Sequence, residues 1–95
     1  MSLEVVIKIS IAFHQTLLNS AQQHQAQHPL SSAQIRALEA QAQAQLQQLG
    51  WRVDYVQICH PDTLLPAQGK QASYVILGAA YLGETRLIDN IEYQI

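Results

Sequence analysis

The segment from Ala72 to Leu82 constrains the fold more than any other, because nearly all of its residues are apolar. A strand with one solvated face alternates apolar and polar residues, whereas a strand buried on both faces is apolar throughout. The segment therefore predicts a central strand with a neighbour on either side. Gly78 interrupts it, and a glycine at such a position indicates a bulge or the close approach of another backbone.

Two further segments supply the neighbours of this central strand. Gly83-Glu84 is a short link, so the segment from Thr85 to Ile95 must return as an antiparallel partner. Its end alternates apolar and polar residues, which predicts one solvated face. The segment from Arg52 to Ile58 contains several β-branched and aromatic residues and predicts the third strand.

The segment from Ser31 to Gly50 predicts an amphipathic helix whose two ends are both marked. Ser31 and Gln34 fit a capping box, in which each side chain bonds the backbone N–H of the other. Gly50 stands where a left-handed residue ends a helix. Between these signals, apolar residues recur at steps of three and four: Ile35, Leu38, Ala42, Leu46 and Leu49.

The first segment, from about Glu4 to Gln27, carries two competing patterns. Residues 5–13 alternate in the manner of a strand, and many of them are β-branched. Val6, Ile9 and Phe13 nevertheless begin a series at helical steps, and no turn signal appears before His28-Pro29. We favour one long helix and leave the strand over residues 5–13 as the alternative.

The predicted order is helix, helix, strand, strand, strand, within a length that allows one domain, residues 1–95. The segments therefore predict an α+β fold, with two helices packed on a small three-stranded antiparallel sheet.

Composition excludes several classes of protein. Five Lys and Arg against seven Asp and Glu leave a net charge of −2, which gives no electrostatic footprint for nucleic acid. No apolar run reaches the roughly 18 residues of a membrane span. One cysteine, Cys59, cannot form an internal disulfide and fits a reducing compartment, so we expect a cytoplasmic protein.

No residues combine into a catalytic or metal-binding motif. His24 and His28 are four apart but lack a third ligand, so no metal site is assigned and both are expected to be solvated. Cys59 and His60 are adjacent on a strand and would point to opposite faces, so Cys59 is expected to be a core residue. No catalytic residue is assigned.

The densest polar cluster lies at residues 85–90 and includes Arg86 and Asp89. One interpretation, which we favour, is a hydrogen-bonded turn that leads into the last strand. The other is an arginine that faces a phosphate or carboxylate across a cleft. Arg86 and Asp89 are thus candidates for substrate binding, and neither is assigned.

Three stretches resemble the pantothenate synthetase (pantoate–β-alanine ligase) family: Val53 to Ile58, Asp62 to Leu64, and Leu82 to Ile91. The most specific is Thr-Arg-Leu-Ile-Asp-Asn at residues 85–90. The resemblance extends over nearly the whole chain and concerns only the C-terminal domain of that two-domain enzyme. It also favours a helix for the first segment, although the alternation over residues 5–13 remains in conflict with it.

The resemblance implies a lid domain whose partner, an N-terminal nucleotide-binding domain, is absent from this sequence. In the family that missing domain carries the His signature, the glutamines that hold pantoate and the pocket for ATP and Mg2+. No family catalytic residue can therefore be carried over, and no cofactor is expected in this chain. The intact enzyme would join pantoate to β-alanine through a pantoyl adenylate, and the isolated domain is expected to be inactive.

The exposed face that would meet the larger domain should favour weak homodimers of the isolated chain. The alternative to the lid is a stand-alone α+β module that binds a protein or a small ligand.

Overall fold

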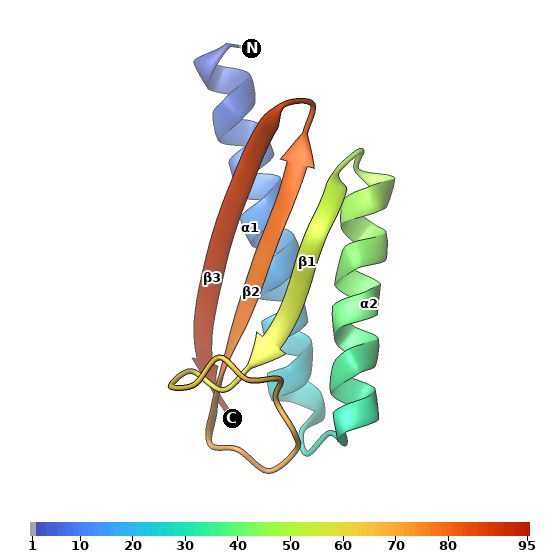
Figure 1. Cartoon of the computed structure of the whole chain (residues 1–95), viewed down its shortest axis with the longest axis vertical. Helices are drawn as coiled ribbons and strands as arrows, with labels where there is room; N and C mark the ends of the chain where they lie inside the picture. Colours follow the sequence, from blue (N-terminus) through green and yellow to red (C-terminus); the bar gives the residue numbers. More distant parts are fainter. Residues whose placement is uncertain (1) are drawn as a thin grey trace.

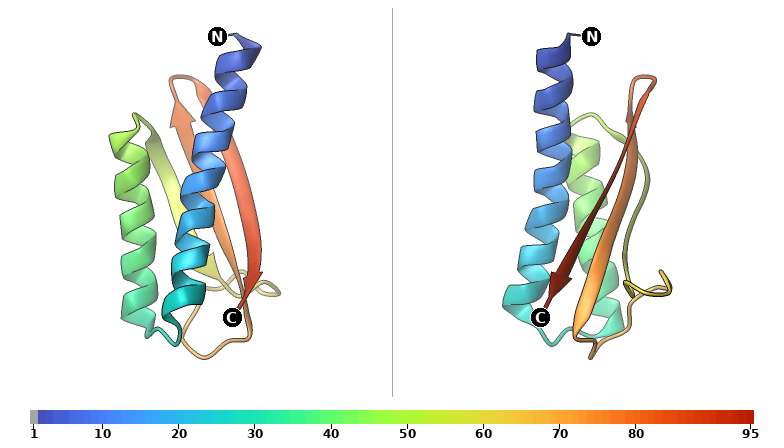
Figure 2. Two further views of the ribbon diagram at one scale, coloured as in Figure 1. Left: turned by 180° about the vertical axis from the view of Figure 1, so that it is seen from behind. Right: turned by 90° about the vertical axis from the view of Figure 1, so that its left-hand side faces the viewer.

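Two helices lie side by side on one face of a three-stranded antiparallel sheet, whose other face is free of helices (Figures 1 and 2). The computed structural model describes residues 2–95. The elements are α1 (Leu3–Gln27), α2 (Ser32–Gln48), β1 (Arg52–Cys59), β2 (Ser73–Leu82) and β3 (Thr85–Gln94). The predicted α+β class and element order are confirmed. Neither helix is both long and apolar enough to cross a bilayer within residues 2–95.

β2 is the central strand, between β1 and β3, as its apolar sequence predicts. Tyr74, Ile76 and Ala80 are buried beneath the helices, and Val75 and Ala79 are buried although they point to the other face. This burial on both faces explains why the segment lacks polar residues.

Gly78 lies in regular strand, and the bulge lies elsewhere. A Cβ built on Gly78 would stand 3.0 Å from both methyl carbons of Leu17 and 3.3 Å from Cζ of Phe13. The close approach is thus made by α1 side chains rather than by another backbone. The register shifts instead in β1, between Val53 and Tyr55. The glycine lets α1 pack close against the centre of the sheet.

α1 is helical throughout, so the strand alternative over residues 5–13 is wrong. The helical series places Phe13, Leu17 and Ala21 on the sheet, where each is no more than 1% exposed. That burial outweighs the local β preference of the segment, because most helical stability in proteins comes from packing one face. Packing on the sheet stabilises the first turn of α1 less, because the start of the helix projects beyond the end of the sheet (Figure 2).

α2 begins and ends where the sequence predicts. Gln34 N donates to Ser31 Oγ at 3.2 Å, and Ser31 N donates to Gln34 Oε1 at 2.8 Å, which completes the capping box. Gly50 has a φ of +94°, in the left-handed region.

Two charged residues of α2 protect the exposed edge of β1, a role that no sequence pattern indicates. Glu39 Oε2 accepts a hydrogen bond from Ile58 N at 2.6 Å. Arg36 Nη2 donates to the carbonyls of Ile58 and Ala67 at 3.0 and 3.1 Å, and its Nε lies 3.2 Å from Glu39 Oε1. Since β1 has no second strand beside it, these contacts satisfy backbone groups that would otherwise be open.

The loop after β1 folds back over Cys59 through a turn in which Leu64 N donates to the carbonyl of His60 at 2.9 Å. Leu64 has a φ of +58°, and Pro66 pairs with Cys59 as an isolated bridge. Cys59 is fully buried beneath this loop, so the expectation of a core cysteine is confirmed. Burial raises the pKa of its thiol, and the nearby carboxylate of Glu39 adds to the shift.

His24 is buried, so the expectation that it is solvated is wrong. α1 packs this turn against β3, where His24 Nδ1 lies 2.7 Å from the hydroxyl of Tyr93 and the imidazole lies 4.3 Å from the ring of Tyr74. His28 remains exposed. Burial lowers the pKa of His24, and the charge of His28 lowers it further.

We predict that acid weakens the fold through His24. Its pKa is lower in the folded state than in the unfolded chain, so the unfolded state binds more protons as the pH falls below about 6.5. The free energy of unfolding should fall between pH 7 and pH 5.5 because of this group, by at most about 1 kcal/mol, a limit set by the ordinary pKa of histidine. Urea unfolding at both pH values should show that the loss is reduced in His24→Gln and kept in His28→Gln. An equal loss in all three proteins would contradict the prediction.

We also predict that Gly78→Val destabilises the domain by about 2 kcal/mol, because the new methyl groups would overlap Leu17 and Phe13. Urea unfolding of the single variant, of Leu17→Ala and of the double variant forms a mutant cycle. The double variant should lose less than the sum of the two single losses, since the smaller residue makes room. Strict additivity would show that the crowding at Gly78 is not the cause.

Candidate functional site

The two candidate residues, Arg86 and Asp89, point to opposite faces of the sheet. Residues 85–90 belong to β3, so the favoured interpretation of this segment as a turn is wrong. In a strand, residues three apart face opposite sides. Asp89 lies opposite Gly78 and faces the helices, whereas Arg86 lies opposite Tyr81 on the open face. The structure therefore separates residues that the sequence places in one cluster.

Asp89 joins β3 to α1. Its Oδ2 lies 2.6 Å from His14 Nδ1, and its Oδ1 accepts a hydrogen bond from Asn90 N at 2.8 Å. The carboxylate is part of a narrow groove between α1 and β3 that Ser10 and Phe13 also line. With both oxygens engaged inside the domain, Asp89 positions the edge strand on the helix.

Arg86 belongs to a cross-strand row on the open face, together with Tyr81 and Arg52. The three are in register on β3, β2 and β1. The guanidinium carbons of Arg52 and Arg86 lie 4.4 and 5.7 Å from the centroid of the Tyr81 ring, within the range of cation–π attraction. We call these three residues the arginine row.

One carboxylate accompanies the row. Arg86 Nη2 donates to Asp54 Oδ2 at 2.8 Å, and Asp54 lies at the bulge of β1. This hydrogen bond raises the pKa of Arg86. Arg52 makes no ion pair with any residue of the described part, residues 2–95.

The arginine row offers positive charge and planar N–H donors. A guanidinium matches the geometry of a carboxylate or a phosphate, with which it forms two parallel hydrogen bonds. The row contains no nucleophile. Within residues 2–95 no three His, Cys, Asp or Glu side chains gather as metal ligands would. The geometry of the row is therefore suited to contact with an anion.

Sequence reasoning found one of the two arginines. Arg86 was a candidate because of its dense polar neighbourhood, whereas Arg52 stands alone at the start of a strand. The two arginines come together only because Arg52 on β1 and Arg86 on β3 both pair with Tyr81 on β2.

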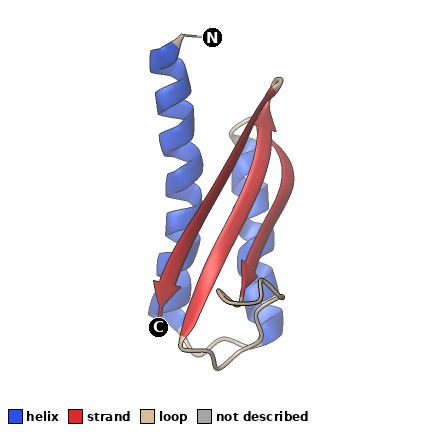
Figure 3. Cartoon of the chain, turned by 60° about the vertical axis from the view of Figure 1, so that its left-hand side comes forward, coloured by secondary structure: helices blue, strands red, loops and turns tan. Residues whose placement is uncertain are grey.

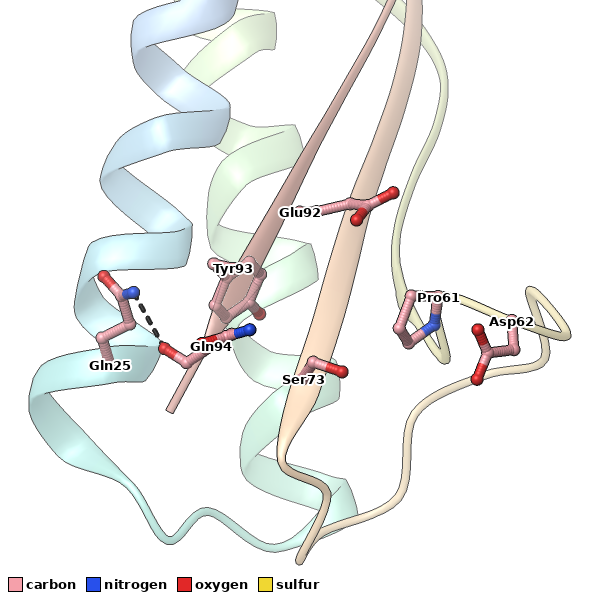
Figure 4. Close-up of a pocket in the computed structure, with 7 residues that line it drawn as sticks. All are labelled: Gln25, Pro61, Asp62, Ser73, Glu92, Tyr93 and Gln94. Atoms are coloured by element: carbon pink, nitrogen blue, oxygen red, sulfur yellow. Dashed lines mark hydrogen bonds between the residues drawn. The ribbon is translucent and has the colours of Figure 1, made fainter.

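A hollow of about 490 Å3 lies at the other end of the sheet, near the C-terminus (Figure 4). Gln25 on α1 closes one side of it by donating from Nε2 to the carbonyl of Gln94 at 2.9 Å. Two carboxylates, Asp62 and Glu92, lie among its lining residues, and no basic residue does. This charge disfavours an anionic ligand, which leaves the arginine row as the better candidate for one.

The fold and the row together define a two-layer α+β domain, with both helices on one side of the sheet (Figure 3) and two arginines on its open face. Residues 7–92 match the family described as Pantoate-beta-alanine ligase. The chain belongs to this family.

Individual relatives agree with the family match. The chain is 52% identical over 59 residues to the pantothenate synthetase of Methylobacillus flagellatus, and 56% identical over 55 residues to that of Nitrosospira multiformis. These matches cover 62% and 58% of this chain. They cover 21% and 20% of the two relatives, so the chain spans about a fifth of their length.

The fold agrees as well. A crystal structure of pantothenate synthetase from Thermus thermophilus superposes with a TM-score of 0.71 and 27% sequence identity. The match covers 96% of this chain and 31% of that chain. Both helices and the sheet therefore have counterparts in a solved member of the family, within a longer protein.

We predict that Asp89 and Arg86 differ in their effect on stability. Asp89→Ala should lower the free energy of unfolding by about 1 kcal/mol, because two hydrogen bonds are lost, one that joins β3 to His14 on α1 and one to Asn90 N. Arg86→Ala should change it by less than about 0.5 kcal/mol, because it loses a single ion pair, which is about as exposed as the His14–Asp89 pair. Urea unfolding measures both, and a cycle with His14→Ala isolates the pair. A larger loss for Arg86→Ala would contradict these assignments.

Proposed function

We propose that residues 1–95 form the C-terminal lid domain of an ATP-dependent pantoate–β-alanine ligase. The family match over residues 7–92 carries the proposal, since it extends over both helices and all three strands. The chain covers 31% of the solved Thermus enzyme, which leaves room for a separate nucleotide-binding domain in such a protein. That domain is the proposed partner of this one.

The proposed reaction has two steps. The carboxylate of pantoate attacks the α-phosphate of ATP, which gives pantoyl adenylate and releases pyrophosphate. The amine of β-alanine then attacks the acyl carbon, and AMP leaves as pantothenate forms. Mg2+ enters with ATP as part of the substrate. Both steps take place on the nucleotide-binding domain, so the isolated chain is inactive.

A lid serves this chemistry by excluding water. An acyl adenylate reacts with water as well as with an amine, and closure over the site protects it. Such a role needs a shaped surface and a few fixed polar groups rather than acid–base residues. The open face of the sheet fits it, because its arginine row presents donors that suit the carboxylate of pantoate or the phosphates of ATP.

We propose Arg86 as a substrate contact in the closed enzyme. Its side chain lies on the open face, and the hydrogen bond from its Nη2 to Asp54 Oδ2 orients the guanidinium. Asp89 is proposed as a positioning residue only, because both of its oxygens are engaged within the domain. The use of ATP and the reduced thiol of Cys59 fit a cytoplasmic enzyme.

The test is a chimera in which this chain replaces the corresponding segment of the Methylobacillus flagellatus enzyme. AMP release that depends on both pantoate and β-alanine should be present in the chimera and absent from the isolated chain. Arg86→Ala in the chimera should lower kcat/KM about tenfold, which corresponds to about 1.4 kcal/mol of lost transition-state binding. Gln57→Ala, an exposed change on the same face, is the matched control and should have no effect.

Two results would count against the proposal. An inactive chimera that folds normally would oppose the lid function. Shifts of backbone amide resonances when ATP or pantoate is added to the isolated chain would favour a stand-alone ligand-binding module instead.

A further inference from the structure

The first turns of α1 present apolar side chains to solvent. Leu3, Ile7 and Ile11 are 76%, 50% and 62% exposed, and Val5 is 44% exposed. Figures 1 and 2 show that the start of this helix extends past the turn between β2 and β3. We call residues 3–11 the apolar end of α1.

The apolar surface of this end covers more than one side of the helix. Leu3, Ile7 and Ile11 follow one another at steps of four and form a stripe, while Val5 lies on a different side. Only Glu4 and Lys8 form a polar stripe, with their charged groups 3.6 Å apart. A surface helix normally turns a single apolar stripe toward its own core. Here Ile9 on the inner side packs against the core, whereas the other side chains named above are left exposed by the described part of the domain, residues 2–95.

The same residues are poor helix formers. Five of the nine are Val or Ile, which lose side-chain freedom in a helix. Helical structure in such a segment depends on packing rather than on propensity. A cover for the apolar end would supply that packing.

Other features gather at this end of the molecule. The corner between α2 and β1 carries Leu49, which is 57% exposed. The arginine row lies at the same end of the sheet, because Arg52 begins β1 and Arg86 follows the turn before β3 (Figure 1). The apolar end and the arginine row therefore lie at the same end of the sheet, α1 on the helix-covered face and the row on the open face.

We propose that the apolar end of α1, together with Leu49, is the surface on which the nucleotide-binding domain of a pantoate–β-alanine ligase docks. The inference rests on the proposed function, which it makes specific by naming the interface. The occupant is a body larger than this domain, since the chain covers only 31% of the solved Thermus enzyme. Such a body can enclose several sides of the helix end at once.

A second copy of this chain fits the surface less well. Nine residues of helix extend for only about 14 Å, so this end can bury less than the roughly 800 Å2 per partner of a stable interface between separate chains. A domain of the same chain is held nearby at a high effective concentration and can dock on a smaller surface. Self-association through the apolar end is thus expected to be weak. This agrees with the proposal that the apolar end contacts the nucleotide-binding domain instead.

Amide hydrogen exchange of the same chimera tests this inference without relying on catalysis. Protection of residues 3–11 should be at least tenfold greater in the chimera than in the isolated chain. Ile11→Lys should return it to the level of the isolated chain, because a charged group replaces an apolar contact. Leu65→Lys is the control, since Leu65 is equally exposed, at 62%, but lies on the loop after β1.

The outcomes separate the two proposals. Equal protection in the chimera and the isolated chain would overturn the docking surface, whether or not the chimera is active. Strong protection in an inactive chimera would support the docking surface and oppose the ligase function. Protection that appears in the isolated chain as its concentration rises, with dimers seen by sedimentation, would overturn the proposal by making a second copy the occupant.

Discussion

The packing of α1 against β2 at Gly78 is the contact on which the rest of the structure depends. Leu17 and Phe13 occupy the space that a side chain at this position would fill. Their approach fixes the height of α1 above the sheet and buries the next turns of the helix. Asp89 lies opposite Gly78 in the register of the sheet, so the same contact places it where His14 can reach it.

Side chains of the two helices hold both edge strands of the sheet through polar contacts. At β1, Arg36 and Glu39 satisfy the backbone of Ile58, which has no strand beside it. At β3, His24 and Tyr93 form a buried polar pair beneath the helix. With one face and both edges held in this way, the sheet can leave its other face open, and the arginine row stands on that face.

The sequence pattern of residues 5–13 favours a strand, whereas the structure has a helix there. The interface proposed for the apolar end of α1 gives a physical reason for this difference. Residues 5–13 read as a strand because they are β-branched and alternate, yet they form a helix. In this domain only the inner positions, such as Phe13, gain from that helix through burial. Docking of a larger domain would give the outer positions the same gain, and it would bring the arginine row close to the junction of the two domains.

The sequence by itself determined the three strands, the capped second helix and the central place of β2, because periodicity, caps and short links are local signals. Its resemblance to the family came separately, from the motifs at residues 53–58, 62–64 and 82–91. It could not determine the site. Arg86 and Asp89 are close in sequence but diverge in a strand, and Arg52 joins Arg86 only through strand pairing. The burial of His24 likewise follows from the meeting of α1 and β3. Only the tertiary structure decided these, since each depends on residues far apart in the chain.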